Sequence, residues 1–122
     1  MTREEKAIAY KQQGCNCCQA VLCAFEDELD LSVEDLKKIG AAFGMGMGCM
    51  EGNCGALCGA QIVLGLKEYQ GYPIAAKARE LHEAFKEKCG STICKELKGI
   101  ETGKVLCSCK DCIQNAVSLL EF

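Results

Sequence analysis

The chain has 122 residues, of which 49% are hydrophobic and 25% are charged, a composition that favours one compact globular domain over a disordered chain. Its net charge of −3 and its pI near 5.2 give no basic footprint, so no nucleic-acid partner is expected. The longest charge-free run, residues 52–66, is shorter than the roughly 20 residues that a spanning helix needs, so no transmembrane segment is expected.

Twelve of the residues are cysteines, about one in ten, which is the density of a disulfide scaffold or a metal site. The first thirteen residues, MTREEKAIAYKQQ, are charged from Arg3 onward and show neither the apolar stretch nor the cleavage site of a secretory signal. A cytoplasmic, reducing location is therefore expected. In such a compartment, clustered cysteines more often bind metal than form lasting disulfides.

Helical periodicity runs through the whole chain and predicts an all-α fold, because no segment shows the sustained alternation typical of a strand. Thr2 and Glu5 give a capping-box pattern for a first helix, which Gly14 interrupts. A second helical segment is expected from Asn16 to about Asp30, since its apolar residues recur at helical spacing.

Further capping signals predict the remaining helices. Ser32 marks the start of a third helix, and Asn53 is expected to cap a fourth. Pro73 suits the first turn of a fifth helix, which stops at Gly90. A last helix is expected within residues 109–120. The prediction is a small single-domain helical bundle covering residues 1–122, in which a glycine-rich loop opens a central helix.

The glycine-rich loop lies within FGMGMGCMEGNCGALCGAQ, residues 43–61. Its glycines complete no dinucleotide fingerprint, and it lacks the Gly-Lys-Ser/Thr of a phosphate-binding loop. Close helix packing could explain Gly55 and Gly59, which lie one turn apart, but it leaves the three cysteines of the stretch unexplained. These are Cys49, Cys54 and Cys58. Because Cys54 and Cys58 are also one turn apart, they are expected to share a helix face.

Several motifs, spread over nearly the whole chain, resemble the C_GCAxxG_C_C family of redox-active proteins. They are NCCQAVL at 16–22, FGMGMG at 43–48, NCGALCGA at 53–60, GSTICKEL at 90–97 and CKDCIQNAV at 109–117. The family signature holds four cysteines in a small helical protein, and the resemblance places them on Cys17, Cys54, Cys94 and Cys112. The chain departs from the family pattern in reading CGALCG for GCAxxG and FGMGMG for the usual FGGG run.

The resemblance implies redox chemistry at these four cysteines, although eight further cysteines lie outside the signature. They are Cys15, Cys18, Cys23, Cys49, Cys58, Cys89, Cys107 and Cys109. Iron-sulfur clusters take four cysteine thiolates, and backbone N–H groups hydrogen-bonded to the sulfurs tune their potential. We therefore expect a cluster for electron transfer to a redox partner protein, held by the signature thiols with Cys49 and Cys58 nearby. Gly52 and Gly55 are expected to bring backbone N–H groups to it.

Three other interpretations stay open on the sequence. Zinc would suit the pairs Cys15-x2-Cys18 and Cys109-x2-Cys112, whose spacing resembles a zinc knuckle. Thiol–disulfide exchange without metal is an alternative, with Cys54/Cys58 or Cys109/Cys112 as the pair, though no thioredoxin-like βαβ pattern surrounds either pair. Storage or delivery of a soft ion such as Cu(I) would use the excess cysteines and the methionines of the glycine-rich loop. A homodimer is compatible with the sequence, and the redox partner stays unidentified.

Overall fold

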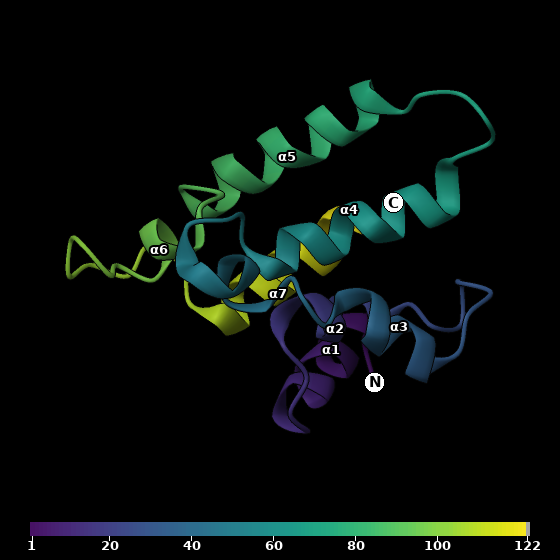
Figure 1. Cartoon of the computed structure of the whole chain (residues 1–122), viewed down its shortest axis with the longest axis horizontal. Helices are drawn as coiled ribbons and strands as arrows, with labels where there is room; N and C mark the ends of the chain where they lie inside the picture. The colour runs from purple at the N-terminus through teal and green to yellow at the C-terminus, as the bar shows by residue number, and fades with distance from the viewer. Residues whose placement is uncertain (122) are drawn as a thin grey trace.

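The computed structural model describes residues 1–121, and this part of the chain forms seven α-helices, one irregular helical turn and no strand. The predicted all-α fold is therefore confirmed (Figure 1). The helices are α1 (Arg3–Gln12), α2 (Cys17–Ala24), α3 (Val33–Gly40), α4 (Gly55–Glu68), α5 (Ala75–Cys89), α6 (Cys94–Leu97) and α7 (Cys109–Leu120), and the irregular turn is η1 (Gly46–Met50).

The core is organised around α2, which contacts α1, α3, α4 and α7. Six of its eight residues are buried, which is the expected outcome for the uninterrupted apolar run that follows Gln19. The longer helix α5 packs on α4 and α7 and runs along one side of the molecule, while α6 and the loop after it project at one end (Figure 1). Both strongly apolar segments, residues 17–24 and 55–64, thus lie in the interior.

Side-chain caps fix three of the predicted helix starts. Thr2 and Glu5 form the capping box of α1, and Ser32 accepts the N–H of Asp35 at the start of α3. Asn16 caps α2 by accepting the N–H of Gln19. The predicted stop of α5 is also confirmed, because Gly90 follows it with a φ of 95°, a backbone conformation that favours glycine.

Two predicted helix starts and one predicted end are wrong. Asn53 does not cap α4. It forms an isolated bridge with Ile93, so the helix has Cys54 as its N-cap residue. Pro73 precedes α5, which begins at Ala75. The helix α2 ends at Ala24 and not near Asp30.

The early end of α2 has a clear cause in α1. The guanidinium of Arg3 donates a hydrogen bond of 2.7 Å to the carbonyl oxygen of Ala24, and it also pairs with Asp27 and Glu28 in the turns that follow. The hydrogen bond satisfies a carbonyl oxygen at the end of α2, and the two ion pairs hold Asp27 and Glu28 in turns that do not continue the helix. Within residues 1–121, no helix combines the length and apolar character that crossing a membrane requires.

Candidate metal centre

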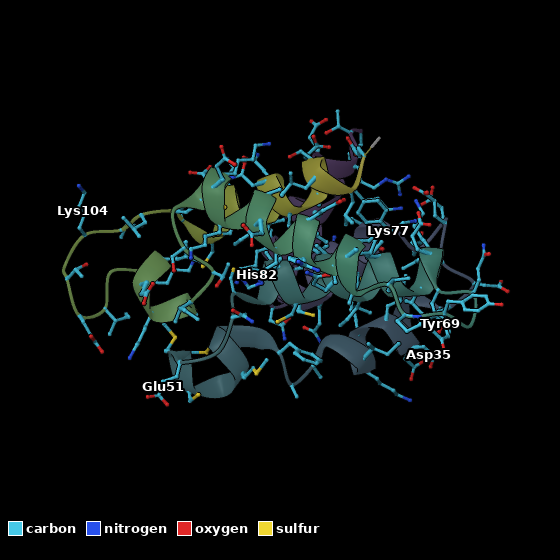
Figure 2. All side chains as sticks on the ribbon, turned by 90° about the horizontal axis from the view of Figure 1, so that it is seen from above. Asp35, Glu51, Tyr69, Lys77, His82 and Lys104 are labelled. Carbon is cyan, nitrogen blue, oxygen red and sulfur yellow. The ribbon has the colours of Figure 1, made fainter. Side chains whose placement is uncertain are left out.

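A cavity of about 220 Å³ lies where α2, α4, α6, α7 and η1 meet. It is lined by Lys11, Asn16, Cys17, Met45, Met50, Cys54, Gly55, Cys94, Lys98 and Cys109. Among these lining residues there are four thiols and two thioethers but no carboxylate and no imidazole. In Figure 2, sulfur atoms gather at the end of the molecule that carries Glu51. Such a donor set suits soft metals and sulfur chemistry, not Ca²⁺ or Mg²⁺.

All four cavity thiols stand at the starts of helices, and for three of them the helix is longer than the four residues of α6. Cys17 is the first residue of α2, Cys109 is the first residue of α7, and Cys54 is the N-cap residue of α4. The aligned peptide dipoles give each of these helix ends a partial positive charge, which favours a thiolate over a thiol. The fold therefore brings together the positive ends of these helices and the sulfurs of cysteines that are far apart in the sequence.

Cys17 and Cys109 are hydrogen-bonded to each other across the cavity. The Cys17 thiol donates to Cys109, which lowers the pKa of Cys109 to about 5, and the nearby ammonium of Lys98 favours the same thiolate. The same hydrogen bond, together with burial, raises the pKa of Cys17. This arrangement favours the thiolate form at Cys109 and the thiol form at Cys17.

Cys54 is stabilised as a thiolate by donors on several sides. A hydrogen bond from the Cys112 thiol lowers the pKa of Cys54 to about 7, and the backbone N–H groups of Ala56 and Leu57 and the charge of Lys98 act in the same direction against burial. As expected from the sequence, backbone N–H groups at the start of α4 are directed at a cavity sulfur. They come from the residues after Gly55 and not from Gly52, whose N–H donates to the Gly46 carbonyl oxygen at 3.1 Å.

Close helix packing, the alternative explanation considered for Gly55 and Gly59, agrees with the structure. A Cβ on Gly59 would lie 2.8 Å from the carbonyl oxygen of Cys18, and one on Gly55 would lie 3.2 Å from the Cys18 backbone nitrogen. Both glycines therefore let α4 approach α2 closely. Because Cys17 and Cys54 stand at the starts of these two helices, the close approach also sets the distance between their thiols.

A second group of sulfurs is buried behind the cavity. The Sγ atoms of Cys89, Cys107 and Cys112 all lie within 4.8 Å of one another. Hydrogen bonds from Cys112 and from Asn115 lower the pKa of Cys89 to about 6, and burial raises the pKa of Cys107 to about 11. Because Cys112 also contacts Cys54, the two groups of sulfurs form one continuous array.

The structure brings three of the four residues assigned by the resemblance to one cavity, namely Cys17, Cys54 and Cys94. Their separation in the sequence is bridged because each belongs to a different helix. Cys112 lies outside the lining and contacts Cys54 from behind. Cys109, one helical turn earlier, lines the cavity in its place. Sequence reasoning could have found it from the Ser108 cap, which starts α7 at Cys109.

Three of the other four predicted site residues, Cys49, Cys58 and Gly52, lie outside this lining. Cys49 is exposed, with its Sγ 3.5 Å from the Gly46 carbonyl oxygen. Cys58 is half-buried on α4, and burial raises its pKa to about 11. Gly52 also lies outside the lining, whereas Gly55 is part of it. Of these two cysteines one turn apart, Cys54 therefore lines the cavity and Cys58 does not.

The cysteine pairs considered for zinc do not converge. Cys15 is hydrogen-bonded to Cys23, whereas Cys109 is hydrogen-bonded to Cys17. Within residues 1–121, no group of three ligand atoms drawn from both pairs lies within 4.8 Å. Of the loop methionines, Met50 places its Sδ 3.8 Å from the Cys94 Sγ. On the sequence, this methionine is one of the loop methionines considered as ligands of a soft ion such as Cu(I).

The fold and the cavity define a small all-α protein with a thiol-lined centre. The model of the family described as "Putative redox-active protein (C_GCAxxG_C_C)" matches residues 15–121, so the chain belongs to this family. No curated protein and no solved structure matches the chain. Membership of a redox-active family and the buried group of three cysteines are both consistent with redox or metal chemistry.

Proposed function

We propose that the cavity binds an iron-sulfur cluster through Cys17, Cys54, Cys94 and Cys109, and that the protein is an electron carrier. The observation that supports this proposal is the presence of four thiols, from four separate helices, in the lining of one cavity. Four cysteine thiolates are the usual ligand set of a [2Fe–2S] or [4Fe–4S] cluster. When bound, such a cluster supplies one-electron transfer.

The spacing of the cavity thiols favours a cluster over a single ion. Zinc–sulfur bonds of about 2.3 Å would bring four tetrahedral sulfurs to roughly 3.8 Å from one another. In the described part of the chain, only Cys89, Cys107 and Cys112 place three ligand atoms within 4.8 Å of one another. The cavity thiols are more widely spaced and enclose a volume of about 220 Å³, which is several times the roughly 30 Å³ share of one water molecule.

The chain's own charges suit a negatively charged centre. The ammonium groups of Lys11 and Lys98 belong to the cavity lining, and the N-terminal ends of α2, α4 and α7 face the same sulfurs. These positive charges offset thiolate charge and raise the reduction potential of a centre held there. Lys98 is half-buried, so solvent screens its charge less than that of a surface lysine.

The cavity has an exposed rim suited to a partner protein. The side chains of Met45 and Met47 are 69% and 49% exposed. In the loop that carries them, the backbone has positive φ angles at Met45, Met47 and Met50. Such backbone strain in residues other than glycine is a feature of functional sites. We infer that this methionine-rich rim contacts the redox partner, and that the protein works in a reducing, cytoplasmic compartment.

A second candidate function rests on the hydrogen bond between Cys17 and Cys109. A thiolate beside a thiol is the starting arrangement for thiol–disulfide exchange. In this alternative, the oxidised form holds a disulfide between Cys17 and Cys109, and two electrons and two protons are taken up when a dithiol substrate reduces it. No metal takes part.

Anaerobic purification with iron supplied during expression tests the two functions. The cluster proposal expects coloured protein with iron and acid-labile sulfide in comparable amounts, and reversible bleaching by dithionite. Cys109→Ser should remove most of the iron, whereas Cys23→Ser, at a buried position outside the cavity lining, should retain it. Colourless, iron-free wild-type protein whose free-thiol count falls by two on mild oxidation would instead support the dithiol function.

A further inference from the structure

We propose that Cys89, Cys107 and Cys112 form a second metal site, which binds a single Cu(I) ion in three-coordinate thiolate ligation. The three Sγ atoms lie within 4.8 Å of one another, so one ion can reach all of them after small side-chain movements. Their residues are 4%, 8% and 0% exposed, which makes the site closed to solvent. It adjoins the cavity through the contact of Cys112 with Cys54, but none of its three residues belongs to the cavity lining.

The surroundings of the three sulfurs are those of a ligand set and not of an apolar core. The side-chain amide of Asn115 places its Nδ2 3.3 Å from the Cys89 Sγ and 3.8 Å from the Cys107 Sγ. The Nζ of Lys98 lies 3.7 Å from the Cys112 Sγ. Polar hydrogens directed at sulfur stabilise thiolate charge, and such outer-shell donors are a general feature of metal–thiolate sites. Sulfur atoms that served only to fill the core would need neither.

The elements that carry the three sulfurs are held together without a metal. Cys89 is the last residue of α5, and Cys112 lies in the first turn of α7, which contacts α5. Cys107 is positioned by its backbone, because its N–H donates to the Leu97 carbonyl oxygen and its own carbonyl oxygen accepts from Lys98 at 3.2 Å. The site is therefore largely preorganised, which lowers the entropic cost of binding an ion.

The number of ligands points to Cu(I). Structural zinc sites are almost always four-coordinate, and within residues 1–121 no fourth cysteine, histidine or carboxylate joins this group at the same spacing. Among the metals that proteins commonly bind, thiolates select Cu(I), zinc and iron-sulfur clusters, and of these Cu(I) readily accepts three sulfurs without a fourth ligand. Binding replaces thiol protons by the ion, the copper stays monovalent, and no electron is transferred. The charge of Lys98 offsets part of the resulting negative charge.

The test is an anaerobic titration of reduced, metal-free protein with Cu(I) supplied as its acetonitrile complex, in competition with a chromogenic Cu(I) chelator. The wild-type chain should bind its first equivalent tightly, and X-ray absorption of the one-equivalent form should report three sulfur neighbours. Cys107→Ser should weaken the first equivalent by more than the tenfold to hundredfold that outer-shell changes cost. Cys89→Ala, which removes a ligand but keeps an apolar residue in the core, should do the same.

The matched control is Cys94→Ser, which changes a cavity thiol outside the group of three. It should keep the first Cu(I) equivalent at wild-type affinity even where it loses iron, so the two proposals can fail separately. Circular dichroism checks that each variant keeps its helices. Equal Cu(I) affinity in the wild type and Cys107→Ser, or a sulfur count of two in the wild type, would each overturn the proposal.

Discussion

The ammonium group of Lys98 lies 3.7 Å from the Sγ of Cys112, which places a half-buried cation at the junction between the cavity thiols and the buried sulfurs. Burial alone would lower the pKa of Lys98, but the sulfurs of Cys112, Cys109 and Cys54 raise it above its usual value. The lysine therefore stays charged at neutral pH. Its charge favours the thiolate form of Cys54 and Cys109.

Replacing Lys98 by methionine should make the cavity thiols less reactive in metal-free protein. Without the cation, the pKa of both Cys54 and Cys109 rises, so a smaller fraction of each thiol is ionised at neutral pH. Alkylation of these two residues by iodoacetamide should slow several-fold, and the pH at which each becomes half-reactive should move upward. Mass spectrometry of the peptides that contain each cysteine measures both effects.

Two lysine variants control this experiment. Lys98→Arg keeps the charge and should keep most of the thiol reactivity. Lys95→Met removes a cation that pairs with Glu101 at 3.1 Å and should leave the cavity thiols unchanged. Equal slowing in Lys98→Arg and Lys98→Met would mean that shape, and not charge, controls the sulfurs.

Replacing Gly55 by valine should damage the centre through the backbone. A Cβ added at this position would lie 3.1 Å from the Phe43 carbonyl oxygen and 3.4 Å from the Cys17 Cβ, and the branched side chain of valine needs more room. The start of α4 must then move away from α2, which separates Cys54 from Cys17. We expect lower iron content and a melting temperature reduced by several degrees, since overpacking typically costs about 1–3 kcal/mol.

Gly65 provides the matched control on the same helix, because a Cβ there meets no atom within 4 Å. Gly65→Val should leave iron content unchanged and alter stability by less than about 0.5 kcal/mol, since valine is a slightly better helix former than glycine. If Gly55→Val kept full iron content, the close approach of α2 and α4 would not be what positions the two thiols.

The sequence predicted the helical fold wherever local chemistry decides it. The caps at Thr2, Asn16 and Ser32 act between residues three apart, so a reader of the sequence sees both partners. Asn53 failed as a cap because its backbone pairs with Ile93, forty residues away, and no local pattern reveals that contact. The end of α2 at Ala24 escaped prediction for the same reason, since Arg3 belongs to a different helix.

The candidate site shows the same division between local and distant information. The resemblance to a known family identified Cys17, Cys54 and Cys94, which the fold then places around one cavity. Cys109 and Cys112 lie one turn apart on the same side of α7, so the choice between them depends on how the start of α7 sits against α2 and α4, which the sequence does not show. The buried group of Cys89, Cys107 and Cys112 joins α5 to α7 and has no signature in the spacing of the cysteines.

Serine at Cys109 and at Cys112 should separate the two assignments of the fourth cluster ligand. Cys109 lines the cavity and Cys112 does not, so Cys109→Ser should lose most of the iron whereas Cys112→Ser should keep most of it. Cys23→Ser, buried beside Cys15, should cost about 1–3 kcal/mol of stability for the buried hydroxyl and no iron. Iron and sulfide analysis of protein handled anaerobically measures the outcome. Loss of iron in Cys112→Ser alone would restore the ligand set expected from the sequence.

The contacts of Arg3 should make the start of the chain important for stability. Its guanidinium donates to the Ala24 carbonyl oxygen, pairs with Asp27 and Glu28, and lies 4.7 Å from the centre of the Phe25 ring. It therefore joins α1 to the end of α2, the helix at the centre of the core. Arg79, which is exposed on α5, offers a surface arginine for comparison.

Arg3→Ala should destabilise the fold at neutral pH by about 2 kcal/mol, the cost of losing a hydrogen bond from a charged donor, whereas Arg79→Ala should be nearly neutral. The hydrogen bond from Arg3 lowers the pKa of Asp27 below its ordinary value. That pairing contributes stability above about pH 4 and is lost as the pH falls through the lowered value. Urea unfolding of the metal-free protein at several pH values should therefore show the deficit of Arg3→Ala narrowing in acid. A deficit that stayed constant down to pH values at which Asp27 is protonated would assign the effect to the hydrogen bond with the Ala24 carbonyl oxygen and to packing against Phe25, and not to the ion pairs.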